Sequence, residues 1–97
     1  MLFARNVKFQ IKEGKLDDFN RTFSADVLPV LKAQAGFKNE LTLLNKSEAL
    51  GISLWQDRGS AEKYETTAYT KVLDKLMPFL NGTPIIEKYD VGVSTLH

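Results

Sequence analysis

The sequence has no cysteine, a single histidine, almost no net charge and no long apolar run. Without cysteine the chain cannot form disulfides, use a thiol in catalysis or bind a metal through thiolates. Its 13 basic and 12 acidic residues are interleaved, so it lacks the one-sided charge that binds nucleic acid or anionic lipid. No segment reaches the ~18 apolar residues that span a membrane. These absences predict a cytoplasmic protein without nucleic-acid or membrane partners.

The lone histidine, His97, is the last residue of the chain. A terminal histidine is more often a frayed and solvated side chain than a catalytic one. With no cysteine either, the sequence offers no side-chain set typical of a metal site. The six glycines are scattered and form no phosphate-binding loop. We therefore expect no metal ion and no bound cofactor.

The 97 residues suit one domain, and their first third predicts a strand followed by a helix. From Leu2 to Ile11 apolar residues alternate with the period of a strand. Gly14 ends this segment, and from Lys15 to Ala35 apolar residues recur every three or four positions, as on a helix face. Pro29 lies inside this pattern without an N–H to donate, which predicts a bend. Gly36 is the predicted C-terminal cap.

The rest of the chain predicts two strands, a second helix in two parts and a last strand. The segments Phe37 to Lys46 and Ala49 to Gln56 read as strands separated by a polar turn of hairpin length. Ser60 is the predicted N-cap of the following helix. Near Thr67 two weak helix formers predict a break in that helix. The segment Ile85 to Thr95 predicts the final strand.

The order strand, helix, strand, strand, helix, strand is that of ferredoxin-like α+β folds. In these folds a four-stranded antiparallel sheet carries both helices on one face. The predicted strands are nevertheless apolar on both faces, since Leu50, Ile52 and Leu54 alternate with the residues on the parity of Trp55. The helices can cover only one of these faces, so something else must cover the other. The simplest cover is the sheet of a second copy, and we expect a homodimer.

Several segments give the chain a resemblance to a known family. They are the alternating first strand with Asn6, the stretch KEGKLDDF, the helix end VLPVLKAQAGFK and the strand-to-helix passage SLWQDRGSAEKY. Over nearly its whole length the chain, taken as one domain of residues 1–97, resembles the dimeric α+β barrel proteins of the antibiotic biosynthesis monooxygenase type. The resemblance implies pairing of two protomers through their sheets and a ligand pocket between sheet and helices. It also implies oxidation of electron-rich phenols or quinols without metal or flavin.

Another branch of that family binds and opens haem, and the resemblance allows its site residues to be compared. That branch has an asparagine on the first strand, a tryptophan on the second helix and a haem-ligating histidine further along. In this sequence Asn6 matches the first, Tyr64 stands in place of the tryptophan and Asp74 in place of the histidine. Aspartate is a poor axial ligand for haem iron. Haem degradation is therefore not expected.

Five residues are candidates for the functional site. Asn6 and Tyr64 are the candidate catalytic residues, and Trp55, Tyr69 and Asp74 are the candidate substrate contacts. The indole could wall a cavity for an aromatic ligand, and the tyrosine hydroxyls could hold or deprotonate a phenolic substrate. The alternative interpretations are a tryptophan of the core, tyrosines that only pack their rings and a solvated aspartate.

Two polar residues of the first strand need separate interpretations. Asn6 faces the same way as Ala4 if the alternation holds, and its amide needs either a backbone partner or a ligand. Arg5 interrupts the apolar parity of the strand. We interpret Arg5 as a structural residue that pairs with Glu87 or Glu40 across the sheet or the dimer.

These features lead to two hypotheses about function. In the first, each subunit of a homodimer has a small apolar pocket that binds, and oxidises, an aromatic or quinol-type metabolite without a cofactor. Asn6 and Tyr64 would stabilise the substrate anion, while Trp55 and the second helix exclude water. In the second hypothesis the pocket only binds a small molecule, or the fold serves dimerisation. Whether the chain is an enzyme stays open at this level.

Overall fold

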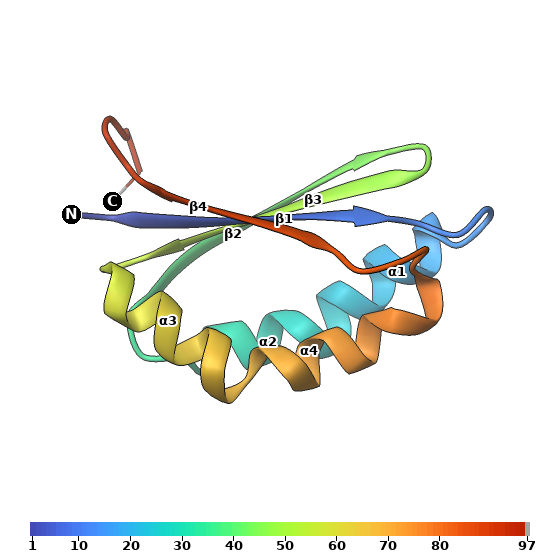
Figure 1. Cartoon of the computed structure of the whole chain (residues 1–97), viewed down its shortest axis with the longest axis horizontal. Coiled ribbons are helices and arrows are strands. Elements are labelled where there is room, and N and C mark those ends of the chain that lie inside the picture. Colours follow the sequence, from blue (N-terminus) through green and yellow to red (C-terminus); the bar gives the residue numbers. More distant parts are fainter. Residues whose placement is uncertain (97) are drawn as a thin grey trace.

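The chain folds into one antiparallel sheet with all of its helices on the same side (Figure 1). The computed structural model describes residues 1–96, and the prediction for His97 lies outside the described residues. The strands are β1 (Phe3–Gln10), β2 (Phe37–Asn45), β3 (Glu48–Trp55) and β4 (Ile85–Asp90), in the spatial order β2-β3-β1-β4. Every neighbouring pair is antiparallel. The ferredoxin-like α+β prediction is thereby confirmed.

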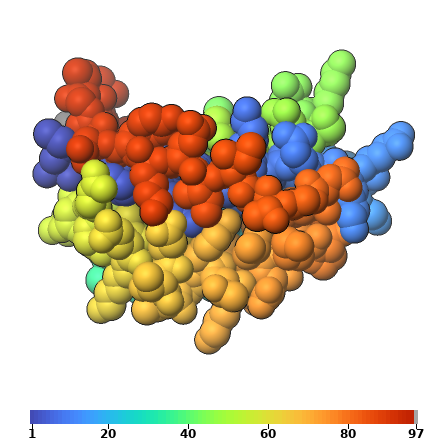
Figure 2. Space-filling model, in the orientation of Figure 1, coloured from blue at the N-terminus to red at the C-terminus, as the bar shows by residue number. Residues whose placement is uncertain are grey.

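Two interrupted helical arms form the layer beneath the sheet. The first arm consists of α1 (Leu16–Thr22), the π-helix η1 (Phe23–Val27) and α2 (Leu28–Lys32), and the second of α3 (Arg58–Thr67), α4 (Tyr69–Leu76) and the 3₁₀-helix η2 (Met77–Phe79). Both arms bow away from the sheet near their middles (Figure 1), and Figure 2 shows β4 lying along the flank of α3 and α4. Among the described residues no helix has both the length and the apolar composition to cross a membrane.

Pro29 shapes the first arm, but through a π-helix instead of the simple bend that we predicted. The backbone N–H of Leu28 reaches the carbonyl of Phe23, one residue further back than in an α-helix. Because proline cannot donate, the chain widens one turn before Pro29 and then begins α2 with the proline in its first turn. The second arm breaks at Ala68, which confirms the predicted interruption near Thr67.

Two predicted boundaries are wrong. Helix α3 is capped by Asp57 and not by Ser60, since the Asp57 carboxylate accepts a hydrogen bond from the backbone N–H of Ser60 at 2.8 Å. A carboxylate at this position also favours the positive end of the helix dipole. Strand β4 ends at Asp90 and not at Thr95, because the chain beyond it leaves β1 after the bond from the N–H of Val91 to the carbonyl of Leu2.

Gly36 is not the helix cap that we predicted, since α2 ends at Lys32 with Ala33 as its C-cap. Its backbone has a φ of 82° in the turn that leads into β2, a conformation that favours glycine. A Cβ at Gly36 would also collide with the side chain of Ser60. The glycine therefore allows the α2–β2 turn to lie directly against the start of α3.

We expect Gly36→Ala to lower the free energy of unfolding by about 2 kcal/mol, because it combines a strained φ with a steric clash. Gly14→Ala is the matched control: Gly14 has a φ of 75°, yet a Cβ added there would meet nothing within 4 Å. It should cost about 1 kcal/mol, from the strained φ alone. Urea unfolding of both variants measures the difference, and equal losses would contradict the close approach to Ser60.

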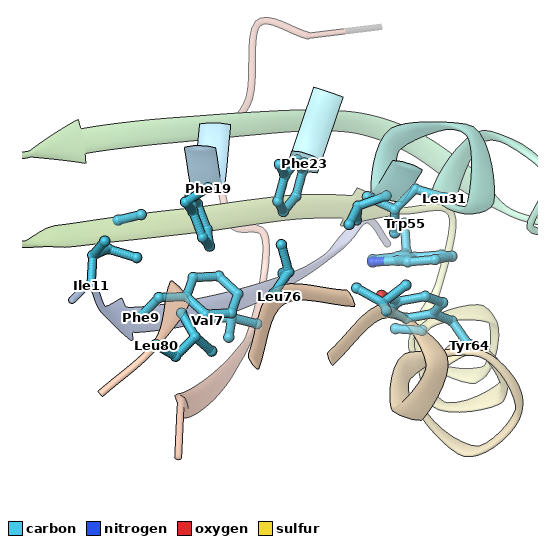
Figure 3. Close-up of a cluster of buried hydrophobic side chains, with 14 of the residues drawn as sticks. Val7, Phe9, Ile11, Phe19, Phe23, Leu31, Trp55, Tyr64, Leu76 and Leu80 are labelled. Atoms are coloured by element: carbon cyan, nitrogen blue, oxygen red, sulfur yellow. The ribbon is translucent and has the colours of Figure 1, made fainter. Parts of the chain in front are cut away.

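The hydrophobic core fills the space between the sheet and the two arms (Figure 3). At one end of the core the rings of Phe9 and Phe19 lie with centroids 5.1 Å apart. At the other end Trp55 stacks on Tyr64 with centroids 5.1 Å apart. Trp55 and Phe19 are both fully buried. The core is thus densely aromatic at both ends, with the interruptions of the arms between them.

The opposite face of the sheet carries no helix among residues 1–96, and its apolar side chains gather on β2 and β3. The alternation is therefore confirmed only in part, since β1 and β4 add Asn6, Lys8 and Glu87 to this face. Leu41, Leu43 and Ile85 are 57%, 46% and 58% exposed on this face. Ile52 and Leu54 lie half-buried between them on β3. We call this surface the outer face. Exposed apolar side chains that gather on one face are a candidate for contact with another chain.

Candidate functional site

A hollow lies between the sheet and the interruptions of the two helical arms. It has about 310 Å³ of empty space, counted up to its opening. It is narrow, since only about 20 Å³ admits the centre of a water molecule, which is room for roughly one water. Its lining comes from the sheet (Arg5, Val7, Phe9, Glu40, Gly51, Ser53) and from the helices (Phe23, Val27, Leu31, Tyr64, Tyr69, Val72). Apolar walls with a few convergent polar groups are typical of small-molecule sites.

The polar groups that the sheet contributes to the hollow belong to one row on its helix-facing side. Cross-strand pairing places Glu40 opposite Ser53, Ser53 opposite Arg5, and Arg5 opposite Lys88. The row therefore draws one residue from each of the four strands. A polar row inside an otherwise apolar layer costs free energy unless its groups are paired or serve a ligand.

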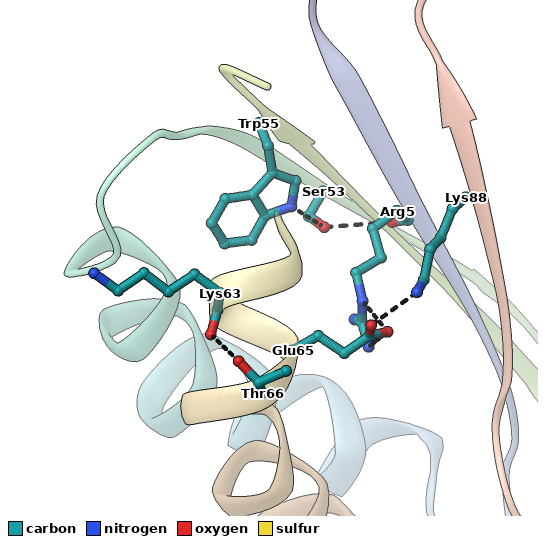
Figure 4. Close-up of polar contacts among 7 residues, drawn as sticks. All are labelled: Arg5, Ser53, Trp55, Lys63, Glu65, Thr66 and Lys88. Carbon is teal, nitrogen blue, oxygen red and sulfur yellow. Dashed lines mark hydrogen bonds and ion pairs between the residues drawn. The ribbon is translucent and has the colours of Figure 1, made fainter. Parts of the chain in front are cut away.

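Arg5 is a fully buried cation, only 2% exposed. Its Nε and Nη2 donate to Oε1 of Glu65 on α3 at 3.4 and 3.5 Å, and Lys88 donates to Oε2 of the same carboxylate at 2.7 Å (Figure 4). The partner of Arg5 is thus Glu65, and the predicted pairing with Glu87 or Glu40 is wrong. The guanidinium carbon also lies 4.1 Å from the ring centroid of Tyr69, a cation–π contact.

Glu65 serves two cations at once, and its pKa reflects this. Partial burial raises the pKa, but the hydrogen bond from Lys88 and the charges of Arg5 and Lys88 outweigh it and lower the pKa. Glu65 is therefore firmly ionised. It ties α3 to both β1 and β4 and offsets the charge of Arg5.

Glu40 is the carboxyl group among the described residues that line the hollow. Burial raises its pKa from 4.5 to about 8, against smaller lowering effects of the Thr42 hydroxyl, which donates to Oε2 at 3.2 Å, and of the Arg5 charge. A Cβ at Gly51 would lie 3.5 Å from Oε2. The missing side chain of Gly51 therefore leaves this carboxyl open to the hollow. A carboxyl that titrates near neutral pH is suited to exchanging protons with a ligand.

The raised pKa of Glu40 makes the stability of the fold depend on pH. Between 4.5 and about 8 the unfolded chain releases a proton that the folded chain keeps, so stability falls as pH rises. From pH 5 to pH 9 we expect this group to lower the free energy of unfolding by about 4 kcal/mol. Glu40→Gln, which cannot ionise, should lose correspondingly less over the same range. Urea titrations at several pH values test this, and parallel pH profiles for the two proteins would contradict it.

The two tyrosines of the hollow are hydrogen-bonding groups and not bases. Burial raises the pKa of Tyr64 and of Tyr69, so neither ionises near neutral pH. The idea that they deprotonate a substrate is therefore not supported, whereas donation from their hydroxyls is. The hydroxyl oxygen of Tyr69 is buried and has no hydrogen-bond partner among the described residues.

Of the five residues predicted for the site, the structure brings only Tyr64 and Tyr69 to the hollow. Asn6 lies on the outer face, opposite Ile52 and Glu87, with its Oδ1 buried and unpaired among residues 1–96. It therefore cannot share a cavity with Tyr64. Alternation of side chains along β1 is the physical reason, because Arg5 and Val7 on either side of it face the helices.

The other two predicted contacts also lie outside the hollow. Asp74 is exposed on α4, as its alternative interpretation held. Trp55 is a core residue between Phe37 and Tyr64. It reaches the hollow only indirectly, because its Nε1–H donates to Oγ of Ser53 at 2.8 Å and Ser53 in turn donates to the carbonyl of Arg5 at 3.3 Å (Figure 4).

The sequence-based interpretation missed Glu40 as a site residue, for an identifiable reason. Pairing between β2 and β3 shifts register between Phe37 and Asn39, which marks a β-bulge. The bulge lets Phe37 and Glu40 face the helices together, although simple alternation places them on opposite faces. Within the described part of the chain, no three histidine, aspartate or glutamate side chains cluster as metal ligands.

Comparisons with known proteins bear on the fold. No family model and no curated protein matches the sequence. A solved protein of unknown function from Nitrosomonas europaea is similar at a TM-score of 0.85 and 18% identity, covering 99% of this chain and 94% of that one. SnoaB, a cofactor-independent oxygenase from Streptomyces nogalater, gives 0.81 and 13%, with 97% and 96% covered.

A third solved structure, from Nitrosomonas europaea and provisionally named an antibiotic biosynthesis monooxygenase, gives a TM-score of 0.79 and 14% identity, with 94% and 90% covered. Identities this low establish a common fold and no more. At that level the resemblance read from the sequence is confirmed: this chain has the α+β fold of proteins of the antibiotic biosynthesis monooxygenase type.

Proposed function

We propose that the chain is a cofactor-independent monooxygenase that oxidises a small, electron-rich phenol or quinol in the hollow. The observation that carries the proposal is the Glu40 carboxyl, open to an apolar hollow and with its pKa raised to about 8. The fold shared with a cofactor-independent oxygenase supports it. Such chemistry needs a base that removes the substrate proton and a pocket that excludes water from the anion.

The proposed reaction needs no bound cofactor because the substrate supplies the electrons. Glu40 takes the hydroxyl proton, and Arg5 on the opposite side of Ser53 stabilises the resulting anion. The anion reduces O₂, and the oxygen adduct loses water. In sum a quinol and O₂ give a hydroxyquinone and one water, so one oxygen atom enters the product and the other leaves as water.

The hollow also limits the size of the substrate. A cavity of about 150 Å³ is enough to hold benzene. The hollow has room for about one water in this conformation, so it does not yet hold a ring. Side chains of the helical arms must therefore move outward when a ring binds. The interruptions at η1 and Ala68 are where the arms have the fewest regular backbone bonds to resist this.

Oxygen uptake tests the proposal. Single-ring quinols should be consumed faster than the three-ring anthrone, and product should form with one O₂ per substrate above the protein-free rate. Tyr64→Phe should lower the rate by about tenfold, because it removes a hydrogen-bond donor from the hollow. Glu62→Gln, an exposed carboxylate of α3, is the matched control and should behave as the wild type. No uptake with any quinol would refute the enzyme.

A second candidate function is a pocket that binds a small molecule without turnover. Like the first function, it requires the hollow to widen, since the site admits about one water in this conformation. This function predicts ligand-dependent increases in melting temperature without oxygen uptake. The two functions are therefore separated by the same quinol panel.

We also propose that two copies pair through their outer faces. The support is the apolar outer face, on which Leu41 and Ile85 are more than half exposed and Ile52 is central. If two sheets pack face to face, the apolar area that they bury stabilises the dimer by about 25 cal/mol per Å². In that dimer Asn6 would lie at the interface and not at the hollow.

Sedimentation velocity at micromolar concentration should therefore show a dimer. Ile52→Asp places a charge at the centre of the outer face and should raise the dimer Kd at least about tenfold. Val93→Asp, at a residue 95% exposed beyond β4, is the matched control and should leave the dimer intact. A wild-type protein that sediments as a single protomer would contradict the pairing.

A further inference from the structure

The hollow is lined by three side chains with complementary chemistry. One can accept a proton, and the other two can stabilise a negative charge. Glu40 stands on β2, Arg5 on β1 and Tyr69 on α4, so they approach it from two strands and one helix. Ser53 lies between Glu40 and Arg5 in the row across the sheet. The hollow thus has a proton acceptor on one side and a cation with a hydroxyl on the other.

Arg5 is only loosely engaged by its protein partner. Charge-assisted bonds between a guanidinium and a carboxylate are typically about 2.7–2.9 Å long. Those from Arg5 to Glu65 measure 3.4 and 3.5 Å, whereas Lys88 holds the same carboxylate at 2.7 Å. The ring of Tyr69 lies against the guanidinium and helps to keep it in place. Arg5 is therefore positioned to stabilise a second anion, one carried by a ligand.

The hydroxyl of Tyr69 is the second unused group. Its oxygen is buried and unpaired among the described residues, a state that costs about 1–3 kcal/mol. A ligand oxygen that accepted a hydrogen bond from this hydroxyl would remove that cost. Because the ring of Tyr69 lies against Arg5, both groups would act on the same part of the ligand.

We propose that the hollow also catalyses keto–enol isomerisation of single-ring carbonyl compounds, without oxygen. Glu40 removes a proton from the carbon beside the carbonyl, and Arg5 and Tyr69 stabilise the enolate oxygen. The broken C–H bond leaves its electron pair in the new C=C bond, and the proton moves to Glu40. Glu40 then returns that proton to the enolate oxygen. No electrons leave the substrate, so no oxidant is needed.

This inference rests on the proposed function, because both reactions begin when Glu40 accepts a proton and an anion forms. They differ in what the anion meets next. With O₂ at the anion the outcome is oxygenation, and without it the protonated Glu40 is the only acid of the row that can return the proton quickly. A carboxylic acid is a far better donor than the two tyrosines, whose pKa values burial raises.

The test uses phenylpyruvate, which has one ring and an acidic CH₂ group beside a carbonyl. Deuterium incorporation at that carbon is followed by NMR in D₂O under argon. Wild-type protein should accelerate the exchange about 100-fold over buffer. Glu40→Gln should abolish the acceleration, and Tyr69→Phe, which keeps the ring but lacks the hydroxyl, should reduce it about tenfold. Glu62→Gln is the control and should match the wild type.

The same protein sample is then given quinols and air, so that the two proposals can fail separately. Exchange under argon without oxygen uptake would support the isomerisation and refute the oxygenase. Oxygen uptake without exchange would support the oxygenase and overturn the isomerisation. Exchange that is equally fast with Glu40→Gln would overturn it too, since the proton would then be moved by another group.

Discussion

Glu40→Gln should lower the rate of quinol oxidation by at least about 100-fold, because it removes the group that, among the described residues lining the hollow, accepts a proton near neutral pH. Glutamine keeps the length of the side chain and can still accept the hydrogen bond from Thr42. The loss should therefore appear in kcat with little change in the fold. Oxygen uptake at saturating quinol, with circular dichroism of both proteins, measures it.

The wild-type rate should also depend on pH in a defined direction. The reactive form of Glu40 is the carboxylate, and its pKa of about 8 predicts a rate that rises with pH and levels off above that value. The exposed Glu62 provides the matched control, since Glu62→Gln should keep both the rate and the pH profile. If Glu40→Gln kept the wild-type rate, Glu40 would not be the base, and another residue or hydroxide would remove the substrate proton.

The fold was accessible from sequence because it depends on repeated, short-range patterns. Apolar and polar residues alternate over β1 and β3, and apolar residues recur every three to four positions in the arms. These patterns predicted the order of strands and helices, and that order is the ferredoxin-like one. The interruptions were also predictable, since Pro29 and Thr67 weaken a helix wherever they occur. What could not be predicted was that Pro29 would act through a π turn, because a missing N–H is compatible with either a bend or a widened turn.

The site was less accessible because it depends on parity across three strands. The position of Asn6 on β1 had indicated the face it shares with Ala4, and the structure agrees with that parity. The resemblance to relatives had nevertheless suggested a catalytic asparagine. Asn6 lies on the outer face and cannot reach the hollow on the other side of the sheet. For Glu40 the reverse holds, since a bulge between Phe37 and Asn39 hides its parity from simple alternation.

Trp55→Ala should lower the free energy of unfolding by about 3–5 kcal/mol, a large share of the roughly 5–15 kcal/mol that holds a small domain folded. The indole is fully buried between Phe37 and Tyr64, and its removal leaves a cavity that these rings cannot close. Because Trp55 is the only tryptophan, unfolding in urea is followed by circular dichroism. Met77→Ala, at a residue 43% exposed, is the control and should cost less than about 1 kcal/mol.

Trp55→Phe then separates the two roles that the sequence allowed for this residue. Phenylalanine keeps a ring against Tyr64 but removes the N–H that donates to Ser53 at 2.8 Å, which should cost about 1–2 kcal/mol of stability. Since Trp55 does not line the hollow, the KM for a quinol should stay within about twofold of the wild type. If KM instead rose steeply while stability was kept, the indole would touch the substrate, and the hollow would have to extend beyond Ser53 toward Phe37.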